Sequence, residues 1–223
     1  MKNTVFVCLI ALASLLATSA KAQSCGNDSI YKLPYKNTYV KATLAADNEF
    51  RTMRPTYMEI PTFETAKKIL PVPIWAGHEK EIEMYWKAWE IGVGNIRNPQ
   101  PGSGFVSPYI DTAYNGNIFM WDSAFILMFA RYGERFFPFQ KTLDNFYAKQ
   151  HPDGFICREI MANGADCFER YDPTSTGPNL LPWCEMIYYH QFGDTERLHK
   201  IFPALCGYYE WLRLNRTWRN GTY

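Results

Sequence analysis

Hydrophobic residues recur every three to four positions over much of this 223-residue chain, which is the repeat of one helix face. Three segments carry such a stripe opposite charged side chains and predict amphipathic surface helices, at residues 79–93, 139–150 and 195–214. Two others, 122–132 and 180–189, are apolar on all sides and predict buried helices. The two kinds alternate along the chain, so the pattern predicts an all-α fold.

The amphipathic segments also predict which side chains face the core. In 195–214 the expected core stripe is Leu198, Ile201, Phe202, Leu205, Tyr208, Tyr209 and Leu212. In 139–150 the side chains expected to face water are Lys141, Asp144 and Lys149. One short helix is expected at 64–70, and one short extended piece at 155–160 is the single strand candidate.

Alternating surface and buried helices are expected from two concentric rings of helices, whereas a simple bundle would make every helix amphipathic. The loops that connect the helices also alternate, in their length. Those after the buried helices are short, at 133–137 and 192–194, whereas those before them are long, at 96–120 and 151–179. Long loops in compact domains are usually functional, so we expect both to meet at one active face.

Trp121 and Asp122 lead into the first buried helix and are the first site candidates. Asp122 is expected at or near the helix N-cap, where a carboxylate complements the helix dipole. On the floor of a cleft the same carboxylate accepts hydrogen bonds from sugar hydroxyls, with Trp121 as a wall. The two roles are compatible, because one oxygen can cap the helix while the other binds.

The second long loop carries four further substrate-binding candidates. Arg158 and Glu159 are either a surface ion pair or ligand-binding side chains on the active face. Asn179 and Trp183 enter the second buried helix as Trp121 enters the first, and for Trp183 a place in the core is the alternative.

The run Asn117-Ile-Phe-Met-Trp-Asp-Ser-Ala-Phe resembles the sugar-binding segment of α/α-barrel glycosidases related to mannosylglycerate hydrolase, processing α-glucosidase and trehalase. Gln150-His-Pro-Asp-Gly-Phe-Ile and the run from Leu180 to Asp194 resemble later segments of that family in the same order. The resemblance covers roughly residues 72–223. It implies a six-hairpin (α/α)6 barrel, of which this chain supplies about half.

The resemblance also implies an inverting glycosidase with one general acid and one general base. The family's acid and base segments have no counterpart here, so both are expected beyond Tyr223. Trehalases carry Gly-Gly-Arg before this Trp-Asp, whereas this chain has Tyr114-Asn-Gly-Asn, which argues against trehalose as the substrate. Residues 23–223 alone are expected to be poorly soluble or oligomeric, and inactive, because the buried helices lack neighbours.

The first 22 residues have the pattern of an export signal. Lys2 precedes an apolar run at 5–16, and Ala-Lys-Ala at 20–22 is a small-x-small cleavage pattern, so the mature chain is expected to begin near Gln23. The run is shorter than the roughly 20 residues that span a bilayer. The alternatives are a short N-terminal anchor and a lipid anchor at Cys25. The expected divisions are a signal peptide at 1–22, an arm at 23–71 and the barrel part at 72–223.

The composition of the chain limits the kinds of ligand that it is expected to bind. The chain has 23 basic and 22 acidic residues, and removing Lys2 and Lys21 with the signal leaves a net charge of −1. This balance provides no footprint for nucleic acid. An aromatic share of 17% fits either a large core or a carbohydrate binder. Cys157 and Cys167 flank one loop and could pair, and no Cys/His spacing indicates a metal, so no cofactor is expected.

Three functions remain open at this point. The first is an exported glycoside hydrolase acting on an oligosaccharide, the second is a non-catalytic carbohydrate-binding α/α protein, and the third is a barrel polysaccharide lyase. A lyase cleft more often presents Tyr, His, Arg or Asn, so Asp122 after Trp121 favours the first two.

Overall fold

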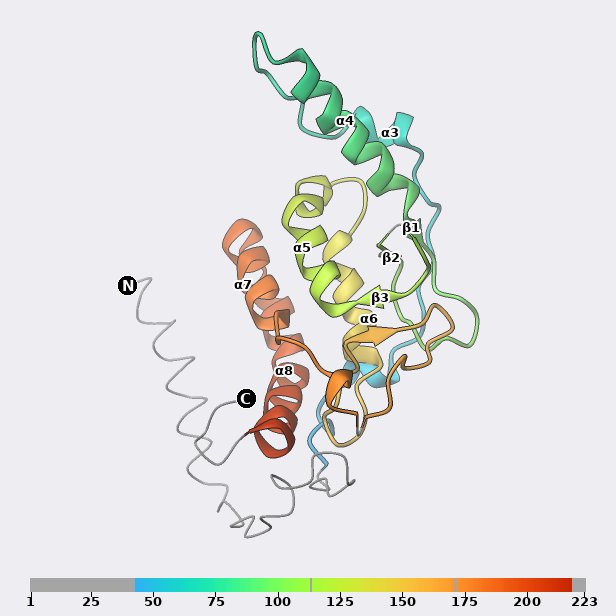
Figure 1. Cartoon of the computed structure of the whole chain (residues 1–223), viewed down its shortest axis with the longest axis vertical. Helices are drawn as coiled ribbons and strands as arrows, with labels where there is room; N and C mark the ends of the chain where they lie inside the picture. The colour runs from blue at the N-terminus through green and yellow to red at the C-terminus, as the bar shows by residue number, and fades with distance from the viewer. Residues whose placement is uncertain (1–42, 113, 171, 218–223) are drawn as a thin grey trace, which may run out of the picture. The chain divides into compact units, whose positions relative to one another are not determined.

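The structure, a computed structural model, describes three stretches of the chain: 43–112, 114–170 and 172–217 (Figure 1). All of them belong to one compact unit. The expected signal peptide at 1–22 and the first part of the expected arm lie outside the described residues.

About half of the described residues are helical, which confirms a mostly α fold. The α-helices are α3 (Phe63–Lys67), α4 (Glu79–Gly94), α5 (Met120–Ala130), α6 (Thr142–Ala148), α7 (Leu181–Phe192) and α8 (Thr195–Arg216). Short 3-10 helices are η1 (Glu49–Thr52), η2 (Arg131–Gly133), η3 (Phe139–Lys141) and η4 (Pro173–Ser175). Two antiparallel pairs of two-residue strands join β1 (Ile96–Arg97) to β2 (Tyr109–Ile110) and β3 (Ile118–Phe119) to β4 (Glu159–Ile160).

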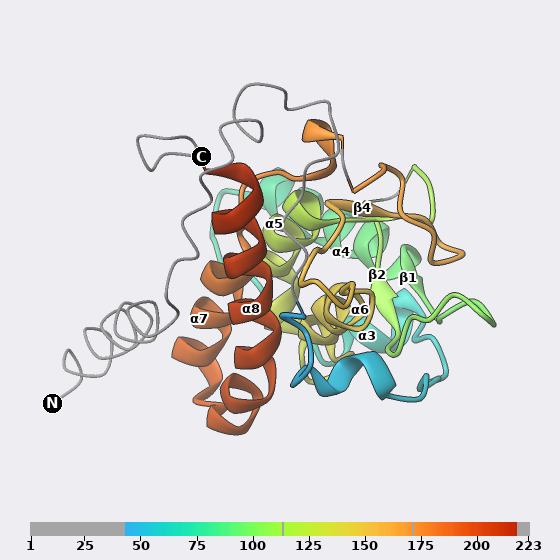
Figure 2. The same cartoon turned by 90° about the horizontal axis from the view of Figure 1, so that it is seen from below.

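A two-residue connection folds α7 and α8 into a helical hairpin, in which they lie side by side (Figure 2). Gly193 ends α7 in the left-handed region at φ +69°, which favours glycine. Asp194 then caps α8, because its side chain accepts a hydrogen bond of 2.9 Å from the backbone N–H of Arg197. The chain therefore reverses direction within the two residues that end α7 and cap α8.

The prediction of a surface helix at 139–150 was wrong. The segment forms η3 and then α6, in which every residue from Thr142 to Tyr147 is buried. Its polar side chains bind the loop before β2: Asn145 Oδ1 accepts from the backbone N–H groups of Val106 and Ser107, at 2.8 and 3.1 Å. Of the three side chains expected to face water, Lys141 is exposed, Asp144 is buried beside Arg197, and Lys149 Nζ donates to the carbonyl of Ser103 at 3.3 Å.

The helices expected to be buried on all sides are buried on one side only. On α5 the buried residues are Met120, Ser123, Ala124, Leu127 and Ala130. The opposite side leaves apolar side chains exposed: Trp121, Phe125, Met128 and Phe129. On α7, which packs against α5, the buried residues are Leu181, Cys184 and Glu185. An unpaired apolar helix face of this kind is expected wherever a further layer is needed to complete a core.

The long helix α8 follows the predicted stripe in part. Ile201, Tyr208 and Leu212 are buried as expected, whereas Phe202 and Tyr209 are exposed. Trp211, one position before Leu212, is fully buried in their place. Within the described residues no helix, α8 included, combines the length and apolar character needed to cross a bilayer.

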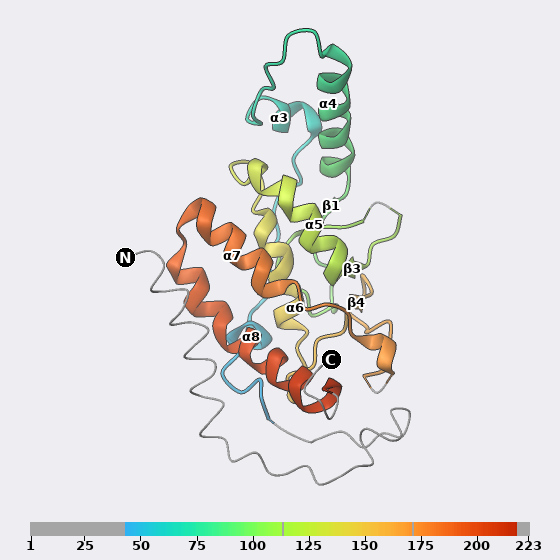
Figure 3. The same cartoon turned by 60° about the vertical axis from the view of Figure 1, so that its left-hand side comes forward.

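The two long loops meet, as the sequence predicted, because a strand of one pairs with a strand of the other. β3 lies in the loop before α5, and β4 lies in the loop before α7 (Figure 3). Their register places Ile118 opposite Ile160 and Phe119 opposite Glu159. The backbone N–H of Met120 also donates to the carbonyl of Arg158 at 2.8 Å, so the start of α5 is fixed against the second loop.

Candidate functional site

A pocket of about 250 Å³ opens where α5 begins. It is lined by Phe119, Met120, Trp121, Asp122, Arg158, Gly177 and Pro178. Three of the six candidate residues from the sequence, Trp121, Asp122 and Arg158, therefore line one pocket at the junction of the two long loops.

Trp121 and Asp122 occupy the first turn of α5, and both side chains are exposed. The helix begins at Met120 with Phe119 as its N-cap and no side-chain capping bond, so the prediction of a capping role for Asp122 was wrong. Within the described residues the Asp122 carboxylate makes no hydrogen bond or ion pair. Trp121 is 51% exposed, and its ring lies 5.5 Å from that of Phe125. A carboxylate and an aromatic face are thus both accessible to a ligand.

A second, larger pocket of about 570 Å³ lies between α4 and α5 and shares Trp121 and Asp122 with the first. Its remaining lining is mostly apolar and includes Ile91, Ile110, Ile126 and Phe129. The first turn of α5 therefore separates two hollows, of which only the smaller is also lined by Arg158.

Arg158 is positioned by its surroundings rather than by a carboxylate. Its Nε donates to the carbonyl of Thr174, and its guanidinium carbon lies 4.1 Å from the ring centroid of Phe168. Its backbone N–H donates to the carbonyl of Ser175 at 3.0 Å. These contacts fix the plane of the guanidinium group at the edge of the pocket.

Glu159 does not line the pocket, although the sequence analysis assigned it a substrate-binding role. Its Oε1 accepts a hydrogen bond of 2.9 Å from Nδ2 of Asn117. Successive side chains of a strand point to opposite faces, so Arg158 and Glu159 cannot serve the same side. The alternative of an Arg158–Glu159 ion pair is also wrong, since no such pair forms in the described structure.

Asn179 and Trp183 lie near the pocket without lining it. Asn179 follows Pro178, and its Oδ1 is buried with no hydrogen-bond partner among the described residues. Trp183 is 39% exposed, so it is not a core residue, and its ring lies 5.9 Å from Phe125 on α5. Asn179 and Trp183 would contact a ligand only if that ligand extends beyond the pocket.

The cysteines carry no disulfide among the described residues: Cys157, Cys167, Cys184 and Cys206 are all free. Burial raises the pKa of the Cys157 thiol, and burial together with the nearby Glu159 raises the pKa of Cys167 to about 12. Both groups are therefore thiols rather than thiolates near neutral pH, which makes them poor nucleophiles.

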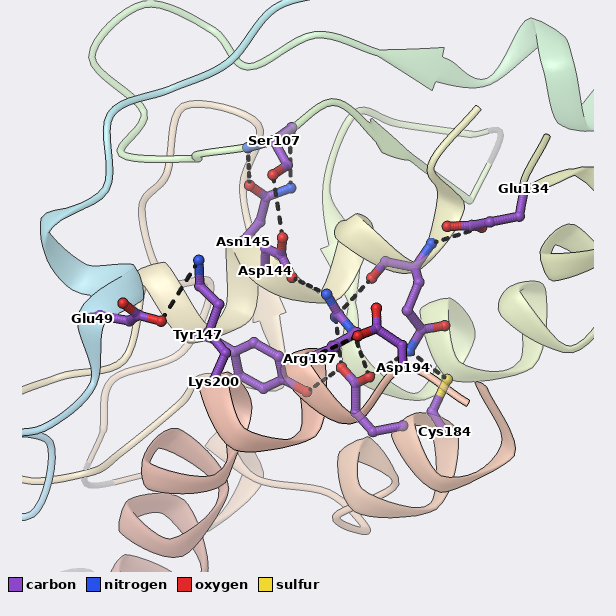
Figure 4. A network of polar contacts seen from close by, with 12 residues as sticks. Glu49, Ser107, Glu134, Asp144, Asn145, Tyr147, Cys184, Asp194, Arg197 and Lys200 are labelled. Carbon is purple, nitrogen blue, oxygen red and sulfur yellow. Dashed lines mark hydrogen bonds and ion pairs between the residues drawn. The ribbon is translucent and has the colours of Figure 1, made fainter. Parts of the chain in front are cut away.

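The sequence analysis missed a buried ionic cluster that joins α6, α7 and α8 (Figure 4). Arg197 donates from Nε and Nη2 to the two carboxylate oxygens of Glu185, each at 2.7 Å. Its Nη1 lies 2.9 Å from Oδ1 of Asp144, a contact close enough for an ion pair but not aligned as a hydrogen bond. Tyr147 and Gln140 donate to the same Glu185 carboxylate at 2.8 and 2.9 Å.

The charges of this cluster depend on one another. Burial raises the pKa of Asp144, and the positive charge of Arg197 opposes that rise. Burial alone would lower the pKa of Arg197, but Glu185 and Asp144 hold it well above its ordinary value. A charged residue inside an apolar helix needs a partner, so Glu185 between Cys184 and Met186 was the sequence signal for this cluster.

Glu134, close to this cluster, is expected to make stability depend on pH. Burial raises the pKa of its carboxyl from 4.5 to about 7. A hydrogen bond of 3.4 Å from the backbone N–H of Gln140 acts in the opposite direction, but its effect is smaller. Because the folded pKa is the higher one, the stabilisation is present below pH 4.5 and is lost as pH rises toward 7. We expect the free energy of unfolding to fall by about 2 kcal/mol from this group between pH 5 and pH 8.

Urea titrations of the wild type and of Glu134→Gln at the two pH values test this expectation. The variant cannot ionise, so its stability should depend less on pH than that of the wild type. Asp144 titrates in the same direction, so the comparison rests on the difference between the two proteins. Equal pH dependence in both would show that Glu134 is not the group responsible.

Comparisons of this chain with protein-family models, with curated proteins and with solved structures give no match.

Proposed function

We propose that this chain belongs to an exported (α/α)6-barrel glycoside hydrolase that acts on an oligosaccharide, and that the pocket at the start of α5 binds one sugar. The observation that carries the proposal is the exposure of Trp121 and Asp122 on one pocket, with the Asp122 carboxylate unbonded within the described residues. The resemblance of the Asn117–Phe125 run to a sugar-binding segment supports the same role.

The chemistry of the lining suits a sugar. A pyranose ring has apolar C–H faces that pack on an aromatic ring such as Trp121 and hydroxyl groups that donate to a carboxylate such as Asp122. Ligand sites are typically apolar pockets with a few placed polar groups that fix orientation, and this pocket has one carboxylate and one guanidinium. Trp121 and Asp122 line the same pocket, so both can contact one ring.

Hydrolysis of a glycosidic bond needs two carboxyl groups, one as acid and one as base. Asp122 is the one carboxylate among the residues that line the pocket, and we assign it to binding. The family resemblance implies an acid and a base that lie in segments other than the pocket described here. The (α/α)6 arrangement is part of the same proposal, and the apolar faces of α5 and α7 are the surfaces that further inner helices would cover.

A non-catalytic carbohydrate-binding protein is the second candidate, and the single carboxylate on the pocket favours it. The two candidates share the same sugar site and differ in turnover. Release of reducing sugar from an oligosaccharide panel by the intact exported protein would support the hydrolase, whereas saturable binding without release would support the binding protein.

Asp122→Asn is expected to weaken sugar binding or turnover by more than about tenfold, or about 1.4 kcal/mol. The amide keeps the shape of the side chain but loses the charge that strengthens hydrogen bonds from sugar hydroxyls. Stability should change by less than about 0.5 kcal/mol, because Asp122 is exposed and unbonded within the described residues. Calorimetric titration and a thermal melt measure the two quantities.

Asp47→Asn is the matched control, because Asp47 is also exposed and lies outside both pockets. It should leave affinity and stability unchanged. Unchanged affinity in Asp122→Asn as well would remove Asp122 from the sugar site and with it the main support for the proposal.

Export is the remaining part of the proposal. We expect the mature protein to begin at Gln23, because Ala20 and Ala22 occupy the small-residue positions of a signal-peptidase site. N-terminal sequencing and mass spectrometry of secreted material check this directly. A chain that starts at Met1, or a lipid on Cys25, would contradict it.

A further inference from the structure

Arg158 presents a guanidinium group whose terminal nitrogens are available to a ligand. Its Nε is engaged with the carbonyl of Thr174, and its plane packs on Phe168. Within the described residues Nη1 and Nη2 form no hydrogen bond or ion pair. The side chain lines the small pocket, so a fixed two-pronged donor lies on the wall of that pocket.

The nearby carboxylates do not neutralise this group. Asp122 lines the same pocket but is not paired with Arg158. Hydrogen bonds to Asp172 Oδ1 from the backbone N–H and the hydroxyl of Thr174, at 2.8 and 2.7 Å, are the largest causes that lower the pKa of Asp172, and the charge of Arg158 is the smallest. A guanidinium group held by a carbonyl and an aromatic ring, rather than by a carboxylate, lacks its usual counter-charge.

We propose that the pocket selects an acidic saccharide, whose oxyanion is bound by Arg158 while its hydroxyl groups donate to Asp122. This proposal rests on the sugar-binding role of the same pocket. The fork of Nη1 and Nη2 matches two oxygens of one carboxylate or one sulfate ester, and such paired charge-assisted bonds are about twice as strong as neutral ones. A neutral hydroxyl group offers a single oxygen and would leave half of the fork unused.

The neighbouring Asp122 explains why the ligand is a saccharide rather than a free anion. Asp122 lines the same pocket of about 250 Å³, so its negative charge opposes the binding of a small free anion beside Arg158. An acidic sugar avoids the conflict, because it presents hydroxyl donors to Asp122 and its oxyanion to Arg158. The pocket therefore requires both features in one molecule.

The test is calorimetric titration of the intact exported protein with sugars that differ only in the acidic group. Glucuronate and galacturonate probe a carboxylate, galactose 6-sulfate probes a sulfate ester, and glucose and galactose are the neutral references. We expect at least one acidic sugar to bind about tenfold more tightly than its neutral counterpart at low salt. Whether the carboxylate or the sulfate shows the gain identifies the group that is recognised.

Variants assign the gain to its source. Arg158→Gln should remove the acidic preference, so that acidic and neutral sugars bind with equal affinity, and Arg158→Lys should keep only part of the preference, because an ammonium group lacks the fork. Arg135→Gln is the matched control, since Arg135 is exposed and lies outside the pocket. It should change nothing.

The outcomes separate this inference from the proposed function. Equal affinity for acidic and neutral sugars, with both sensitive to Asp122→Asn, would overturn the inference and leave the sugar site intact. If free sulfate or acetate binds as tightly as the acidic sugars and no neutral sugar binds, the ligand is an anion and not a saccharide. That result would overturn both the inference and the proposed sugar site. An acidic preference that survives Arg158→Gln would overturn the assignment to Arg158.

Discussion

Arg197→Met is expected to lower the free energy of unfolding by about 4 kcal/mol. The methionine keeps most of the aliphatic packing but leaves Glu185 and Asp144 without the charge that neutralises them. Glu185 is 1% exposed and Asp144 is 4% exposed, so water cannot replace the lost partner. Removing one member of a buried ion pair typically costs 3–5 kcal/mol for this reason, as roughly estimated from other proteins. Urea denaturation at pH 7 measures the loss.

Two further variants test whether the loss of stability comes from the charges of this cluster. Arg135→Met changes an exposed arginine and should cost less than about 0.5 kcal/mol. Arg197→Met combined with Glu185→Gln should be more stable than Arg197→Met alone, because the amide removes one stranded charge and can still accept from Tyr147. A double variant that is less stable than the single one would show that the charges are not the source of the loss.

The Arg197→Met loss should also shrink in acid. Arg197 opposes the rise in the pKa of Asp144 that burial causes, so removing it raises that pKa further. A carboxyl group with a raised folded pKa contributes stability below its unfolded pKa and loses it as pH rises. The variant should therefore be closer to the wild type at pH 5 than at pH 7, and a gap that does not depend on pH would contradict the electrostatic explanation.

The sequence predicted the helices better than their surroundings. Helical periodicity depends on local spacing, so α4, α5, α7 and α8 begin and end within a few residues of expectation. Burial depends on segments far away in the chain, and α6 shows the consequence. Asp144 was expected to face water, but it is buried beside Arg197, and its neighbour Asn145 binds a loop about 40 residues earlier. A polar side chain with a distant buried partner has the same local pattern as a solvated one.

The predictions for the candidate site also succeeded in part and failed in part. Trp121, Asp122 and Arg158 line the pocket as predicted, because the two long loops that carry them meet. Glu159 was included because it follows Arg158, but strand alternation directs it to Asn117 instead. The pairing of β4 with β3 joins segments about 40 residues apart in the chain, and the local pattern at 155–160 does not contain it.

Gly164→Ala is expected to cost about 3 kcal/mol and to disturb the hairpin that carries Arg158. Gly164 lies in the turn after β4, where its N–H donates to the carbonyl of Met161 at 2.7 Å. Its φ of +85° is in the left-handed region, which costs an alanine about 1 kcal/mol. A Cβ atom there would also lie 1.7 Å from the carbonyl oxygen of Ser103, so the turn or the loop must move.

Gly102→Ala separates the two contributions. Gly102 has nearly the same backbone, at φ +81°, but a Cβ atom there has no neighbour within 4 Å. It should lose only the conformational part, about 1 kcal/mol, so the difference between the two variants in urea denaturation measures the contact with Ser103. Because β4 and the start of α5 share the hydrogen bond between Met120 and Arg158, Gly164→Ala should also weaken sugar binding, whereas Gly102→Ala should not. Equal losses of stability in the two variants would mean that the turn yields to the added methyl group, and that its close approach to Ser103 does not hold the Arg158 hairpin in place.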